Sequence, residues 1–205
     1  MHFDDTSTSL SDTLNRTIDS IQGDTVTLRA LMLTIGEQGL LLLCAIAALP
    51  FLIPVSIPGV STVFGGAIIL LAIAITMNSL PWLPARLLDR ELATAKLIPA
   101  LRKGVKFVSR IDRWVRPRAL ALTSGPFMRI NGLVLTFGGL LLMAPFGFVP
   151  FSNTAPAIGI LLLTIGMLQR DGLFVLLGYL GTVLTVVYFS VLIYAAVWAG
   201  GTFFG

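Results

Sequence analysis

Hydrophobic residues along this chain gather in three long runs that contain no charged residue. The runs cover residues 38–85, 130–169 and 173–199. Prolines interrupt the first two near the middle, namely Pro50, Pro54, Pro58, Pro145 and Pro150. A proline inside a helix lacks its N–H and clashes with the preceding turn, which costs ~3 kcal/mol or more. The first two runs are therefore predicted to be broken helices.

The arms of the broken runs are short. We expect arms at 38–49 and 60–80 around a turn at 50–59, and arms at 130–144 and 157–169 around a turn at 145–156. Crossing a hydrocarbon core of ~30 Å takes about twenty helical residues, which only 60–80 supplies. We therefore expect re-entrant hairpins that enter and leave the membrane on one side. Two thin spans are the alternative for the second run.

The two broken runs also resemble each other. Leucines at 40–43 and 140–142 precede the first proline of each run, and Ser56 and Ser152 each stand two residues after the second. The pattern predicts an internal repeat of Pro-broken helical hairpins. Transporters use duplicated, interrupted hairpins to hold ions or anionic groups at the broken helix ends. The alternative is that the breaks only fold a short chain compactly.

The third run, 173–199, is uninterrupted and is predicted to be a long transmembrane helix. The fold class is therefore an all-α polytopic membrane protein. Composition agrees, because 56% of residues are hydrophobic and 12% are charged, against about 25% charged in soluble domains. Mean hydropathy is +0.92. We expect one membrane domain, residues 38–205, after an acidic amphipathic segment, residues 1–37.

Positive charge is concentrated between the two broken runs. Residues 86–129 hold eleven of the fourteen Lys and Arg residues against three acidic residues. By the positive-inside rule this region and the N-terminus are cytoplasmic, and the C-terminus is periplasmic. Apolar and basic positions between 98 and 115 predict an amphipathic helix on anionic lipid headgroups. A nucleic-acid partner is disfavoured, because the apolar face would be left in water.

The first 37 residues carry a hydrophobic stripe of helical spacing at Leu10, Leu14, Ile18 and Ile21. Asp24 is expected to cap a second helix that begins near residue 26. The stripe would dock on a cytosolic partner or on the surface of the protein itself.

Polar groups at membrane depth are costly, so those that border the runs are candidate binding residues. They are Arg170, Asp171, Asn153, Ser56 and Glu37. Neighbours in sequence do not face each other on a helix, so we expect Asp171 to pair with a cation of 86–129. Arg170 suits bidentate contact with phosphate, and a topology anchor is the alternative. Asn153 is expected to cap the returning helix.

Several kinds of chemistry have no residues to support them. His2 is the only histidine and Cys44 the only cysteine, so we expect no metal site and no disulfide. Paired carboxylates, a nucleophile–base set and a phosphate loop are not found in the sequence. The protein is therefore expected to need no cofactor and not to be an enzyme.

Four stretches carry a family resemblance. They are GEQGLLLLCAIAALPFLIP at 36–54, PGVSTVFG at 58–65, SLPWLP at 79–84 and NTAPAIGILLLTIGMLQRDG at 153–172. Over residues 25 to 195 the chain resembles the ExoD-type exopolysaccharide synthesis family of bacterial membrane proteins. The resemblance implies an inner-membrane protein needed for exopolysaccharide production, and it implies no reaction.

Two functions follow as hypotheses. The first is a non-enzymatic accessory or assembly factor that associates with the exopolysaccharide machinery. The alternative is a transporter or flippase for an anionic substrate, such as a polyprenyl-phosphate or a lipid-linked sugar. We also expect a homodimer, because the glycines at 65–66, 138–139 and 178–181 allow close helix approach between subunits.

Overall fold

The computed structural model describes residues 15, 18–19, 23–53, 59–79, 89, 91–95, 98–99, 102, 118–144, 146 and 149–204. The N-terminal stripe and the amphipathic helix of 98–115 lie almost wholly outside these residues. So do Pro54, Ser56, Pro58 and Pro145. What is described is mostly helical.

Among the elements whose bounds the described residues give, there are five helices and two short 3₁₀ helices. They are α2 (Leu28–Ala48), η1 (Leu49–Leu52), α3 (Val60–Thr76), η2 (Leu120–Thr123), α6 (Pro126–Leu142), α7 (Thr154–Leu168) and α8 (Gly172–Phe204). The apolar part of α2, taken together with η1, is residues 36–52. Helices α3, α6 and α7 have 17, 17 and 15 residues, which correspond to helix lengths of roughly 22–25 Å. In α8, Gly172–Trp198 is long and apolar enough to cross a membrane. The predicted long apolar helix is confirmed.

Proline positions explain where the first two runs break. Pro50 is the second residue of η1, and α3 starts only after Gly59, whose φ of 84° is left-handed. In the second run α6 ends at Leu142 and α7 begins at Thr154. The predicted turn of 145–156 was wrong at its C-terminal side. Pro156 lies in the first turn of α7, where a missing N–H removes no helical hydrogen bond.

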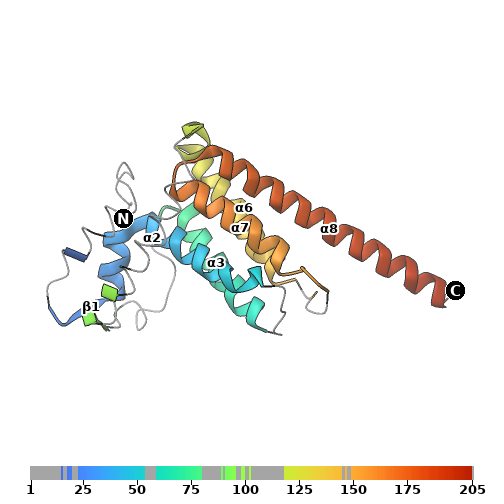
Figure 1. Ribbon diagram of the computed structural model, residues 1–205, viewed down its shortest axis with the longest axis horizontal. Coiled ribbons are helices and arrows are strands. Elements are labelled where there is room, and N and C mark those ends of the chain that lie inside the picture. The colour runs from blue at the N-terminus through green and yellow to red at the C-terminus, as the bar shows by residue number, and fades with distance from the viewer. Residues whose placement is uncertain are drawn as a thin grey trace.

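The four short helices pack side by side, and α8 packs along α7 (Figure 1). Contacts run from α2 to α3, from α3 to α6, from α6 to α7 and from α7 back to α2. Gly65 and Gly139 let α3 and α6 approach closely, because a Cβ on Gly65 would lie 3.0 Å from the Gly139 carbonyl oxygen. The largest fully buried side chains come from all five helices: Leu40, Leu41, Ile68, Ile75, Leu135, Leu142, Ile160, Leu163 and Val175.

The bundle has two chemically different ends. One, the break end, holds η1, the start of α3 and the segment 143–153. The opposite end, here the polar end, holds residues 36–38, 77–79, 118–125 and 169–172. Helix α8 begins at the polar end and runs past the break end, so that the C-terminus lies well beyond the bundle (Figure 1).

A small antiparallel ribbon departs from the all-α prediction. Strand β1 (Thr25–Thr27) pairs with β2 (Glu91–Ala93), and Arg29 Nε lies 3.0 Å from Asp89 Oδ1. The predicted Asp24 cap is also wrong, because Thr27 is the N-cap of α2 and its hydroxyl accepts from the Ala30 N–H at 3.2 Å. The ribbon joins two segments far apart in sequence, so local helical periodicity gave no sign of it.

A matched pair of glycine variants tests the α7–α8 packing. A Cβ on Gly178 would lie 2.7 Å from the Leu163 nitrogen, whereas a Cβ on Gly66 would meet nothing within 4 Å. We expect Gly178→Ala to destabilise the protein by about 1–3 kcal/mol through overpacking. Gly66→Ala should leave stability equal or raise it by up to ~1 kcal/mol. Thermal unfolding in detergent measures both, and equal melting temperatures would contradict this packing.

Candidate functional site

The polar end begins with a strained turn after α7. The Asp171 N–H donates to the Gly166 carbonyl at 2.9 Å, and the Arg170 N–H donates to the Met167 carbonyl at 3.4 Å. This is a Schellman-type helix end, in which the left-handed position normally holds glycine. Arg170 occupies that position with a φ of 54°. A side chain there costs ~1–2 kcal/mol, which makes Arg170 a candidate for a role that glycine cannot fill.

Asp171 connects three segments at this end. Its carboxylate is completely buried, and its Oδ1 accepts from the Leu173 N–H at 2.9 Å, which caps α8. Its Oδ2 lies 3.6 Å from Nε of Arg118, and the Gly172 N–H donates to the Arg118 carbonyl at 2.7 Å. The prediction that Asp171 pairs with a cation from 86–129 is confirmed.

Glu37 adds a second acidic group at the polar end. It follows a kink in α2 at Gly36, whose φ of 61° and ψ of −148° are not helical. Its Oε1 is shielded from solvent and accepts no hydrogen bond from the residues that the structure describes. Burial raises the pKa of Glu37 to about 7, while the positive charge of Arg170 acts in the opposite direction. The carboxyl group can therefore gain or lose a proton near neutral pH.

Asn131, which sequence reasoning missed, anchors the polar end internally. The residue is completely buried in α6. Its Nδ2 donates to the Leu122 carbonyl at 2.8 Å, and its Oδ1 accepts from the hydroxyl of Tyr179 in α8. The sequence carried one sign of this role. Asn131 is the second residue of the charge-free run 130–169, and a polar group there needs a partner inside the protein.

The break end holds the remaining candidates. Asn153 is buried at the N-cap position of α7, but its side chain makes no capping hydrogen bond, so the predicted cap is wrong. Ser152 instead donates to the Phe146 carbonyl at 2.8 Å. The structure thus brings Glu37, Arg170 and Asp171 to the polar end and leaves Asn153 roughly 22 Å of helix away. Ser56 lies outside the described residues.

The chemistry available at the polar end is anion binding and proton exchange. Arg170 offers a guanidinium group and Glu37 a carboxyl group with a pKa near 7. Across the described ranges, no group of three or more His, Cys, Asp or Glu residues could hold a metal ion.

These features define the class as a helical protein with one helix of membrane-spanning length and ionisable groups at one end of its bundle. The family model "Exopolysaccharide synthesis, ExoD" matches residues 10–191. The chain therefore belongs to the ExoD family, which confirms the resemblance and links it to exopolysaccharide synthesis. Family and apolar helix together indicate a membrane protein.

Two curated relatives match most of the chain, and one of them carries the family's name. Protein ExoD of Rhizobium meliloti (strain 1021) is 62% identical over 201 residues, which cover 98% of this chain and 84% of that protein. An uncharacterized protein of Synechocystis sp. is 27% identical over 165 residues, covering 80% of this chain and 76% of that protein. No solved structure matches the chain.

The raised pKa of Glu37 predicts a pH-dependent stability. Because the folded state holds this proton up to about pH 7 and the usual pKa is 4.5, folding binds a proton in that interval. The contribution is therefore fully present below about pH 4.5 and is lost as the pH rises through 7. Glu37→Gln should flatten the fall in melting temperature between pH 5 and pH 8. Glu91→Gln, at an exposed carboxylate, is the control, and an unchanged slope in Glu37→Gln would contradict the burial.

Proposed function

We propose that this chain is a multi-pass inner-membrane protein that supports exopolysaccharide synthesis by associating with other components of the machinery. In this role it is not an enzyme. Membership of the ExoD family supports a role in exopolysaccharide synthesis, and the exposed far part of α8 supports action through association with other proteins.

That far part of α8 carries the proposal. The first half of the helix packs on α7 and buries Val175, Thr182 and Phe189. Beyond the break end, Tyr194 is 74% exposed and Trp198 is 67% exposed. In a membrane such a surface meets lipid or another protein. Tyrosine and tryptophan are among the residues that contribute most to protein interfaces, which favours a protein partner.

The distribution of charge supports a topology for the membrane domain. Glu37, Arg118, Arg170 and Asp171 all lie at the polar end, which is continuous with the basic region 86–129. The helices that lead from there to the break end are too short to cross a bilayer of ~30 Å comfortably. We propose that they form two repeated, re-entrant hairpins. The N-terminus and the basic region are then cytoplasmic, anionic headgroups lie beside the basic region, and α8 carries the C-terminus to the periplasm.

Replacing two side chains on one face of the far part of α8 by Ala tests the accessory role. Tyr194 and Val197 are three residues apart and share a face. Replacing both with Ala should weaken association by roughly tenfold, the effect of ~1.4 kcal/mol, and lower exopolysaccharide output. Crosslinking and co-purification from the native membrane measure the association.

A control uses side chains that are equally exposed on another helix. Val63 is 71% exposed on α3, and Met77 directly follows that helix. Replacing these two with Ala should leave output unchanged. Normal output from the α8 double variant, at normal membrane levels, would contradict the accessory role.

A specific observation favours a second candidate, transport of an anionic substrate such as a polyprenyl-phosphate or a lipid-linked sugar. Arg170 keeps a large side chain where glycine would relieve strain, and its positive charge acts on Glu37, a carboxyl group whose pKa is about 7. A guanidinium group suits bidentate phosphate contact, and a proton on Glu37 would strengthen the local positive charge.

Two substitutions at Arg170 separate transport from an anchoring role. Arg170→Gly removes the guanidinium group, and the fold should be retained because glycine suits the positive φ at this position. Arg170→Lys keeps the charge but not the bidentate geometry. The transport candidate predicts that both lose substrate movement in reconstituted vesicles while membrane levels stay normal. An anchor predicts that Arg170→Lys keeps full activity.

A further inference from the structure

An apolar groove runs between α6 and α8 on the outer surface of the bundle. Its volume is about 550 Å³, within the range of ligand pockets. The residues that line it are Ile130, Leu133, Val134, Phe137, Tyr179, Thr182, Val183, Val186 and Val187. The candidate site residues Glu37, Arg170 and Asp171 are not among them.

The walls of the groove present carbon, because their hydroxyl groups are already engaged. The hydroxyl of Tyr179 donates to Asn131 inside the bundle. Thr182 donates to the Gly178 carbonyl of its own helix at 2.9 Å. The groove therefore offers no hydroxyl to a polar ligand and suits a hydrocarbon.

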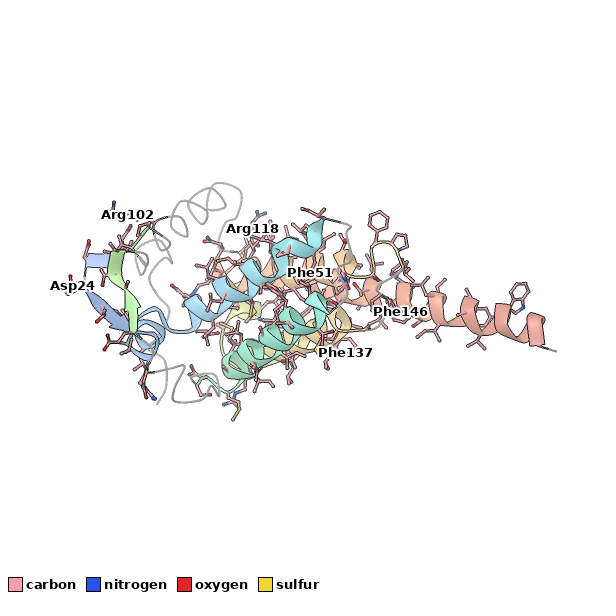
Figure 2. The ribbon with its side chains drawn as sticks, turned by 90° about the horizontal axis from the view of Figure 1, so that it is seen from below. Asp24, Phe51, Arg102, Arg118, Phe137 and Phe146 are labelled. Atoms are coloured by element: carbon pink, nitrogen blue, oxygen red, sulfur yellow. The ribbon has the colours of Figure 1, made fainter. Side chains whose placement is uncertain are left out.

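Towards the break end, the chain that follows α6 is held against α8. The ring centroids of Phe146 and Phe189 lie 4.7 Å apart, and the Tyr188 hydroxyl donates to the Pro150 carbonyl at 2.6 Å. Phe146 and Pro150 thereby contact α8 just beyond the last lining residues. In Figure 2, Phe146 lies further along the long axis than Phe137, towards the C-terminal part of α8.

Towards the polar end, cationic groups lie beside the groove. Exposed Arg129 immediately precedes Ile130 and stands one helical turn before Leu133. The first turn of α6 contains no acidic residue. Arg118, half-exposed, lies at the same end (Figure 2). A ligand with a hydrocarbon chain and an anionic head matches this distribution of apolar surface and charge.

The size of the groove favours a flexible chain over a helix from a second copy. Lining residues on α8 extend from 179 to 187, about 12 Å along the axis. A helix of that length has only about two turns, and it would leave most of its own surface outside an open groove. A hydrocarbon chain is thin enough to lie within the groove, whose volume is about 550 Å³.

We propose that the α6–α8 groove binds one acyl chain of an anionic phospholipid, with the lipid phosphate at Arg129. This site is separate from the surface of α8 assigned to partner association, so either can fail without the other.

Native mass spectrometry of the full chain tests this, with the protein purified in micelles that hold equal amounts of phosphatidylglycerol and phosphatidylcholine. Val183 lines the groove and is 57% exposed. Val183→Trp should therefore fill the groove while leaving the buried core undisturbed. We expect the wild type to retain phosphatidylglycerol and Val183→Trp to lose it several-fold. Val63→Trp, on exposed α3 surface, should retain it as the wild type does.

The phosphate contact has its own test. Arg129→Gln should reduce the preference for phosphatidylglycerol over phosphatidylcholine roughly fivefold, the effect expected of one cation near an anionic headgroup. Arg29→Gln, at a partly exposed cation of α2 outside the basic region, should not.

Three results would overturn the proposal. These are equal lipid retention in Val183→Trp and Val63→Trp, an unchanged lipid preference in Arg129→Gln, or loss of an oligomer rather than of lipid in Val183→Trp.

Discussion

The buried carboxylate of Asp171 is the interaction on which the arrangement of α8 depends. It caps the first turn of α8 and lies beside Arg118, while its backbone closes the turn that ends α7. A buried charge is stable only when it is paired and hydrogen-bonded, so these contacts must form together. Asp171 thus caps the start of α8 and holds Arg118 of the basic region beside it.

The remaining helices depend on close backbone approach. Glycines that were expected to serve contacts between subunits instead lie inside this chain: Gly65 and Gly139 join α3 to α6, and Gly178 joins α7 to α8. These glycines therefore do not support a homodimer, which would have to form through other surfaces. The long exposed part of α8 is such a surface, because the short bundle leaves it uncovered.

The two ends of the bundle differ in the residues that they carry. The ionisable residues Glu37, Arg118, Arg170 and Asp171 lie at the polar end, and the interruptions of the two runs lie at the break end. The candidate site could be predicted in part, since Arg170, Asp171 and Glu37 border charge-free runs. That Arg170 takes a left-handed conformation, and that its charge acts on Glu37, could not be predicted, because both follow from how α7 ends near α2.

The sequence by itself determined the helical class, the long C-terminal apolar helix, the two interrupted runs and the family, because each depends on local composition and spacing. It also determined that Asp171 needs a cation, since a charge beside apolar runs requires one. Only the tertiary structure decided which cation that is, that Asn131 links α6 to α8, and that Thr25–Thr27 form a strand. Those outcomes depend on partners distant in the chain, and a local pattern carries no information about them.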